Sequence, residues 1–135
     1  MDLMKVIQIA AAGMQAQGTR VRIIAENIAN ADSLAETPDG DPYRRKIVTF
    51  QNLLDRELGV NKVSVKRIRL DMSDFGKRFD PQHPAADADG YVKTPNVKSL
   101  LEVMDMRQAQ RSYQANLGVI TLSKRMIGQT IDLLR

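Results

Sequence analysis

The sequence contains no cysteine and no tryptophan, and it is poor in other aromatic residues and in histidine. Among its 135 residues there are three tyrosines, three phenylalanines and one histidine. The absence of cysteine excludes disulfides, zinc sites with thiolate ligands and cysteine nucleophiles. Aromatic side chains normally supply much of the area of a compact core, so aliphatic residues and methionine must fill this one. The composition therefore favours helix–helix packing over a β-sandwich.

Long hydrophobic runs are also lacking. No stretch approaches the ~20 apolar residues of a membrane-spanning helix, so we expect no direct membrane insertion. The N-terminal segment does not resemble a secretory signal either, because Asp2 precedes its apolar part and Lys5 and Gln8 interrupt it. We expect a soluble protein that, if it is exported, does not use an ordinary cleaved signal peptide.

Two amphipathic segments occupy the two ends of the chain, and each predicts a long helix. Residues 1–35 carry an apolar stripe at heptad spacing, formed with one exception (Gln17) by Leu3, Ile7, Ala10, Met14, Val21, Ile24 and Ile28. Residues 95–135 carry a second apolar stripe at heptad spacing, and Pro95 and the N-cap candidate Asn96 lie at its start. Their stripe comprises Val103, Met106, Gln110, Tyr113, Leu117, Ile120, Lys124, Ile127, Ile131 and Leu134.

The segment between the helices, residues 36–94, holds all five prolines and predicts a small β-rich module. Residues 43–50 and 63–70 have β-character, whereas residues 51–58 are predicted as a short helical turn. The predicted fold class is therefore mainly α with a small β-rich insert. We expect the long terminal helices to pair as an antiparallel coiled-coil layer, with a β-hairpin-like module between them.

Each terminal stripe needs a partner, and the two can cover one another only in part because they differ in length. Gly13, Gly18, Gly118 and Gly128 interrupt the helices at a cost of ~1 kcal/mol each relative to alanine. Small residues in "QIAAAGMQAQG" suit a tightly packed helix layer. The simplest partners are other copies of the chain or related chains, with ordering of the helices on assembly.

Candidate chemistry is sparse. His83 lies between two prolines and near several aspartates, but the spacing matches no metal-binding loop and predicts a rigid turn. No catalytic arrangement can be argued from a single histidine, so we expect no enzyme activity, no cofactor and no metal. The basic patches "YRRK" and "KRIR" leave open an alternative, a basic helical protein that binds nucleic acid.

Three motifs give the chain a specific resemblance. "ENIANADS" (26–33) resembles the N-terminal signature of the bacterial flagellar axial proteins, the rod–hook family. "FDPQHPAADADGYVKTPNV" (79–97) and "EVMDMRQAQRSYQANLGVI" (102–120) resemble the proximal rod proteins within that family. The resemblance covers nearly the whole chain. It implies a structural subunit of the basal body that polymerises helically into the torque-transmitting drive shaft.

The resemblance also implies a place and partners. The protein would lie in the periplasmic rod, after export by the flagellar type III machinery without a cleaved signal peptide. It would contact other copies of itself, other rod proteins, a rod-base adaptor and basal ring components, and no nucleic acid. We expect subunit contacts at sixteen residues of the terminal segments: Leu3, Ile7, Met14, Val21, Ile24, Asn27, Ile28, Asn30, Met106, Arg111, Tyr113, Asn116, Leu117, Ile120, Ile127 and Ile131.

Overall fold

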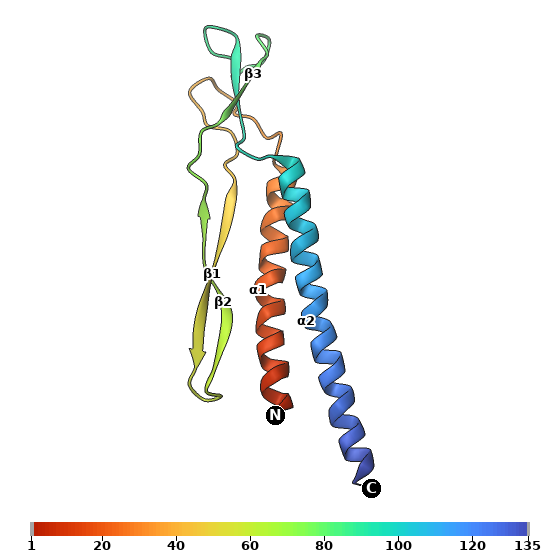
Figure 1. Cartoon of the computed structure of the whole chain (residues 1–135). Helices are drawn as coiled ribbons and strands as arrows, with labels where there is room; N and C mark the ends of the chain where they lie inside the picture. Colours follow the sequence, from red (N-terminus) through yellow and green to blue (C-terminus); the bar gives the residue numbers. More distant parts are fainter. Residues whose placement is uncertain (1, 135) are drawn as a thin grey trace. The chain divides into compact units, whose positions relative to one another are not determined.

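The computed structural model describes residues 2–134, and in that range it contains two long helices and four strands (Figure 1). The elements are α1 (Leu3–Ala29), β1 (Lys46–Asp55), β2 (Val60–Leu70), β3 (Gly76–Phe79), β4 (Tyr91–Thr94) and α2 (Ser99–Leu133). The prediction of a mainly α fold with a small β-rich insert is confirmed. Neither described helix combines the length and the apolarity that crossing a membrane would require.

The two helices start differently from one another. Asp2 caps α1, because its Oδ1 accepts hydrogen bonds from the backbone N–H groups of Met4 and Lys5 at 3.0 and 3.3 Å. In contrast, α2 begins at Ser99, three residues after the predicted cap at Asn96. Asn96 does not cap the helix, because its side chain bonds Arg45 and the segment after β2 instead.

The strands form two separate two-stranded sheets, β1 with β2 and β3 with β4. The predicted helical turn at 51–58 is wrong, because β1 continues to Asp55. The Asp55 side chain accepts the N–H groups of Glu57 and Leu58, and Gly59 adopts a φ of 64° and donates its N–H to Asp55 O at 2.8 Å. This turn chemistry outweighs the helix-forming composition of the segment and closes a hairpin.

The second hairpin has a long, proline-rich loop. β3 and β4 run antiparallel with Gly76 opposite Thr94 and Phe79 opposite Tyr91. Gly90 closes the loop with a φ of 82°, and its O accepts the N–H of Asp80 at 2.9 Å. A side chain at Gly90 would also meet the Phe79 ring at 3.0 Å, so both conformation and space require glycine.

The chain divides into two compact units. Within the described residues, the first unit contains 2–21, 48–67 and 107–134, and the second contains 22–47 and 68–106. Each unit therefore takes part of α1, part of α2 and part of the β1–β2 hairpin.

In the first unit, α1 and α2 contact one another through small residues. Ala10, Ala16 and Ala109 are buried, and a Cβ at Gly13 would lie 2.8 Å from Nδ2 of Asn116. The β1–β2 hairpin joins the unit through Lys62, whose Nζ bonds Gln8 of α1 at 3.2 Å and Asp55 at 2.7 Å. Small residues therefore allow α1 and α2 to approach closely within this unit, and Gly13 is one of them.

The face that α2 turns toward α1 in this unit differs from the predicted apolar stripe. Ala109 and Ser123 are buried and Asn116 is half-buried, whereas Tyr113, Leu117 and Ile131 of the stripe are exposed. The side chains that allow close approach are thus small or polar. Each lies one residue before a position of the predicted apolar stripe. Heptad spacing identified a stripe correctly but could not tell which of two neighbouring stripes meets α1.

Gly118 and Gly13 have different surroundings and together provide a paired test of helix packing. We expect Gly118→Ala to raise the free energy of unfolding of the isolated chain by about 0.5–1 kcal/mol, because its Cβ would meet no atom within 4 Å and alanine favours helix. Gly13→Ala should lower it by about 1 kcal/mol, because the added Cβ displaces Asn116. Urea unfolding followed by circular dichroism measures both. Equal effects of the two substitutions would contradict this account.

Candidate functional site

Asn27 is the centre of a buried polar cluster in the second unit. Its side chain is 1% exposed and makes four hydrogen bonds. Nδ2 donates to Lys46 O at 2.9 Å and to Oε2 of Glu102 at 3.1 Å, while Oδ1 accepts Lys46 N–H and the Tyr43 hydroxyl at 2.9 Å each. A carboxamide has two donor hydrogens and two acceptor lone pairs, so this one is fully satisfied.

Glu102 brings the start of α2 to the same point. Its side chain is 1% exposed, and Oε1 accepts a charge-assisted hydrogen bond from Nε of Arg45 at 2.5 Å. Arg45 also pairs with Asp71 at 3.4 Å through Nη1. A buried carboxylate is stable only when it is paired and hydrogen-bonded, and here Asn27 and Arg45 supply both. Asn27, Tyr43, Arg45, Lys46, Asp71, Asn96 and Glu102 are called the polar cluster below.

Asn96 and Arg44 attach the segment after β2 to this cluster. Asn96 Oδ1 accepts Arg45 N–H at 2.8 Å, and its Nδ2 donates to Asp71 O and to the Ser73 hydroxyl at 2.9 Å each. Arg44 donates to Asp71 O and Ser73 O at 3.0 Å each, and its guanidinium lies 4.0 Å from the centre of the Phe75 ring. Backbone groups of an irregular segment are thus satisfied by side chains.

Local interactions shift the pKa values of several groups in and around the cluster. The backbone N–H of Ser73 and, less strongly, Arg45 hold the pKa of Asp71 below its usual range. Lys46, at 2.8 Å, lowers the pKa of Glu26. Burial raises the pKa of Tyr43, whose hydroxyl must stay protonated to donate to Asn27. These shifts favour the ionised form of Asp71 and Glu26 and the neutral form of Tyr43.

The second asparagine of "ENIANADS" has a local role. Asn30 lies just past the end of α1, and its Nδ2 donates to Glu26 O at 2.9 Å. Its Oδ1 accepts the Ser33 hydroxyl at 3.1 Å. Asn30 thus terminates the helix, as its residue type predicts, whereas Asn27 is a buried connector.

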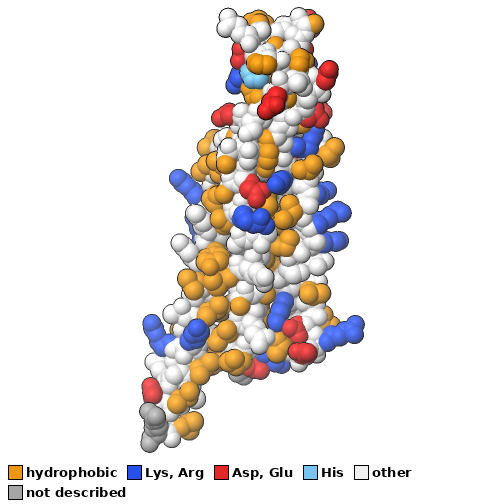
Figure 2. Space-filling model, turned by 180° about the vertical axis from the view of Figure 1, so that it is seen from behind, with side chains coloured by type: hydrophobic (Ala, Val, Ile, Leu, Met, Phe, Trp, Pro, Cys, Tyr) orange, Lys and Arg blue, Asp and Glu red, His pale blue; other side chains and the backbone are white. Residues whose placement is uncertain are grey.

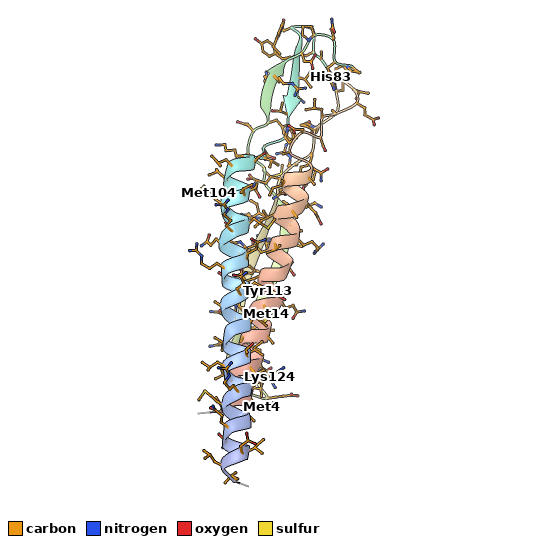
Figure 3. The ribbon with its side chains drawn as sticks, turned by 90° about the vertical axis from the view of Figure 1, so that its right-hand side faces the viewer. Met4, Met14, His83, Met104, Tyr113 and Lys124 are labelled. Carbon is orange, nitrogen blue, oxygen red and sulfur yellow. The ribbon has the colours of Figure 1, made fainter. Side chains whose placement is uncertain are left out.

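Large exposed apolar side chains of α2 form a candidate assembly surface. They include Leu117, which is 46% exposed, and Leu122, which is 57% exposed. Figure 3 shows Met104, Tyr113 and Lys124 along this helix, and Figure 2 shows hydrophobic side chains on the molecular surface. The exposed apolar residues of α2 are Leu100, Leu101, Val103, Met104, Tyr113, Leu117, Val119, Leu122, Met126, Ile131 and Leu133.

The predicted contact residues fall into two groups. On α1, none of those predicted from the stripe is exposed, and Ile24 and Asn27 are buried within the chain. On α2, Arg111, Tyr113, Leu117 and Ile131 are exposed, whereas Met106, Asn116, Ile120 and Ile127 are half-buried. The chain itself therefore covers the α1 residues in part or fully and leaves the first α2 group exposed. Their contact with other subunits stays a prediction.

Sequence reasoning missed most of the polar cluster. Arg45 and Lys46 looked like part of a basic patch, yet the structure engages them with Glu102, Asp71 and Glu26. Glu102 is an acidic residue in the first turn of a helix, which is common on solvent-facing helices. The available signal was Asn27, an amide between Ile24 and Ile28 of the apolar stripe.

His83 has a structural setting. Its Nδ1 accepts the backbone N–H of Ala85 at 3.0 Å within the loop between β3 and β4, where Figure 3 places it. No group of three or more potential metal ligands occurs among residues 2–134. In the same range, Oε1 of Gln17 is a buried acceptor that no hydrogen-bond donor reaches.

The cluster predicts a large difference between the two asparagines. We expect Asn27→Leu to lower the free energy of unfolding by about 3 kcal/mol, because it leaves the Lys46 backbone and Glu102 without partners. Asn30→Leu is the matched control and should cost about 1 kcal/mol, because its neighbours reach water. Denaturant unfolding measures both. A smaller cost at Asn27 than at Asn30 would refute the assignment of Asn27 as the connector.

The lowered pKa of Asp71 predicts acid sensitivity with a definite sign. A carboxyl whose pKa is lower in the folded state stabilises the fold above its unfolded pKa of about 3.9 and loses that contribution as pH falls through the folded pKa. We expect the melting temperature to fall below about pH 4, with a shallower fall in Asp71→Asn. Thermal melts between pH 2 and 7 measure this. Identical slopes in both proteins would count against it.

Comparison with known proteins gives matches in both terminal segments and over nearly the whole chain. Residues 7–33 match the family model described as flagella basal body rod protein, and residues 88–133 match that of the flagellar basal body rod FlgEFG protein C-terminal. The chain is 52% identical over 128 residues to the flagellar basal-body rod protein FlgC of Agrobacterium fabrum, covering 95% of this chain and 92% of the relative.

More distant relatives match over the same length. The protein of the same description from Salmonella typhimurium is 40% identical, with 98% of each chain covered. That of Aquifex aeolicus is 38% identical, with 98% of this chain and 97% of the relative covered. The matches extend through both helices and the β-rich middle, and the chain belongs to the family of flagellar basal-body rod proteins of FlgC type.

Proposed function

We propose that this chain builds the proximal part of the flagellar rod by helical polymerisation through α1 and α2. Membership of the family makes it a structural rod protein and not an enzyme. The observation that carries the mechanism is the exposed apolar surface of α2, which a subunit of a polymer can bury and a free monomer cannot.

The accessible surface area supports incorporation into an assembly. The chain exposes 9460 Å². A compact monomer of 15.1 kDa would expose about 7,100 Å² by the usual scaling. The difference exceeds the roughly 800 Å² per partner that a standard interface buries. Burial of this surplus on assembly is the driving force that we assign to polymerisation.

The pairing of α1 with α2 as an antiparallel coiled coil is part of the proposal. Gly13 lies beside Asn116 and Gly18 approaches Tyr113, so residue numbers rise on one helix as they fall on the other. Residues 1–35 and 95–135 would supply an inner helical layer of the rod, with 36–94 as its outer part. The contacts through glycine and alanine suit a layer in which helices pack closely.

Family membership supports a proposal for the partners and the location. Other copies of the chain, other rod proteins, a rod-base adaptor and basal ring components would surround it in the periplasmic rod. The flagellar type III machinery would export it, without a cleaved signal peptide. The terminal helices would become fully ordered as subunits join, because their glycines weaken each helix alone.

Complementation of a gene deletion tests the proposed assembly surface. We expect the parent chain to restore motility and rod formation, and the double variant Leu117→Ser/Leu122→Ser to reduce flagellated cells at least ~10-fold, because it removes exposed apolar area. Leu54→Ser, on β1 and comparably exposed, is the control. Electron microscopy of basal bodies gives the measurement.

The variant protein must first be shown to fold. Circular dichroism of the purified double variant should match the parent, because both leucines are exposed in the isolated chain. Full motility of a folded Leu117→Ser/Leu122→Ser variant would contradict assembly through this surface of α2.

A further inference from the structure

In the first unit, α2 continues past the N-terminal end of α1. Gly13 lies beside Asn116, and residue numbers rise on one helix as they fall on the other. Both helices advance by the same rise per residue, so Leu3, the first residue of α1, comes level with about position 126 of α2. Figure 1 shows the last turns of α2 beyond the start of α1. Residues 129–134, which are all exposed, are called the overhang.

The apolar side of the overhang continues a stripe that the chain covers further up the helix. Ile120, Ile127 and Leu134 follow one another at intervals of seven residues and therefore lie on one side of α2. Ile120 and Ile127 are half-buried, whereas Leu134 is 83% exposed and Ile131, one turn before it, is 55% exposed. The stripe is thus covered beside α1 and bare in the overhang.

The start of α2, in the second unit, carries another group of exposed apolar side chains. Leu100, Leu101 and Met104 are 74%, 55% and 60% exposed, and Figure 3 labels Met104 near this end of the helix. Glu102 lies among them in the sequence but is buried, because its carboxylate belongs to the polar cluster. Leu100, Leu101 and Met104 are called the α2 start patch.

Each of the two apolar surfaces has one charge beside it, and the charges are opposite. Lys98 is the one charged residue between positions 95 and 101, and Asp132 is the one charged residue between positions 126 and 134. Both side chains are exposed, and neither belongs to an ion pair within residues 2–134. Because a lysine has a long flexible stem, a single pair of this kind places little demand on geometry.

We propose that the overhang of one copy of this chain docks on the α2 start patch of the next copy. Ile131 and Leu134 pack against Leu100 and Leu101, and burial of this apolar area drives the contact. Asp132 of one copy pairs with Lys98 of the other at the rim. The proposal deepens the proposed rod function, on which it rests, because it names the surfaces through which successive subunits meet.

The two surfaces cannot meet within one chain. The thirty residues from Leu101 to Ile131 belong to one helix and span about 45 Å. Their contact is therefore between chains and heterologous, and it closes into a ring or continues as an open helix. An open helix is what a rod requires.

The charges favour this pairing over pairing of like surfaces. Two overhangs in contact would oppose two copies of Asp132, and two start patches would oppose two copies of Lys98. Like charges brought together at an interface disfavour that arrangement, whereas the contact between an overhang and a start patch brings opposite charges together. The occupant that fits each surface is thus the other surface of a second copy.

Paired leucine variants of the overhang test which side of it docks. Sedimentation velocity of the purified full chain should show concentration-dependent association. Leu134→Ser should weaken this association at least ~10-fold. Leu133→Ser is the matched control, because Leu133 is as exposed but a step of one residue turns about 100° around the helix. It should change the association less than ~2-fold, and circular dichroism checks each fold.

Mixing two blocked variants tests the heterologous arrangement. Ile131→Ser/Leu134→Ser removes the overhang surface, and Leu100→Ser/Leu101→Ser removes the start patch, so each variant alone should be monomeric. An equimolar mixture should form dimers and nothing larger, because only one intact overhang can meet one intact start patch. A contact between like surfaces would give dimers of each variant by itself and would contradict the proposal.

A charge exchange tests the rim pair. Lys98→Glu and Asp132→Lys should each weaken association at least ~3-fold, because each opposes two like charges across the contact. The chain that carries both substitutions should associate within ~2-fold of the parent, because the pair is restored in reverse. A double variant as weak as the single ones would remove this pair from the proposal's contact and overturn it.

Other outcomes would also overturn the docking. They are no self-association of the parent at up to about 1 mM, no dimer in the mixture, and equal effects of Leu133→Ser and Leu134→Ser. A monomeric parent whose overhang variants still abolish rods in cells would assign the overhang to a different rod protein. If the overhang variants restore motility fully and Leu117→Ser/Leu122→Ser does not, the docking fails while the rod function stands.

Discussion

The saturated carboxamide of Asn27 is the interaction on which the second unit depends. Four donors or acceptors from Tyr43, from the Lys46 backbone in β1 and from Glu102 in α2 meet at this side chain, and both Asn27 and Glu102 are 1% exposed. A displacement of any one element would leave buried polar groups unpaired, at 1–3 kcal/mol for each. Apolar packing alone tolerates sliding, whereas this cluster accepts one register of α1 against α2. Buried polar groups act in this way to fix register in some coiled coils.

In the first unit, the described parts of the helices are held together by close packing of small residues and not by buried hydrogen bonds. Its helices meet through alanine, glycine and serine, which allow close approach but bury little area. Several larger apolar residues of α2, among them Leu117 and Leu122, remain exposed. Register is therefore set in the second unit by hydrogen bonds, while the first unit leaves apolar side chains of α2 exposed. A division of this kind separates the specificity of the monomer fold from the affinity of the polymer.

The periodic parts of the fold could be predicted, and the polar connections could not. Heptad spacing located both long helices, because burial on one side imposes that repeat whatever the partner is. It did not distinguish the stripe at Tyr113 and Leu117 from its neighbour at Asn116 and Ser123, since serine and asparagine are not recognisable as contact residues. The turn after Asp55 was missed, because Leu53 and Leu54 suggested a helix while the hydrogen bonds of Asp55 decided for a hairpin.

The polar cluster, too, could be predicted from the sequence only in part. Asn27 was expected at a subunit contact, whereas the structure buries it inside the chain, and Arg45, Asp71 and Glu102 gave no sequence signal, because charged residues usually lie at the surface. Their pairing depends on segments 26 to 57 residues apart in the sequence. Contacts between residues so far apart leave no periodic pattern in the sequence.

Asn27 bonds the main chain of residue 46 and not its side chain. The lysine there can be exchanged for many other residues without touching those two bonds, provided that the newcomer has a backbone N–H, which excludes proline. At position 27 only a carboxamide of this length presents two donors and two acceptors. The side chain at position 46 can therefore change during evolution, whereas the hydrogen-bond geometry requires asparagine at position 27.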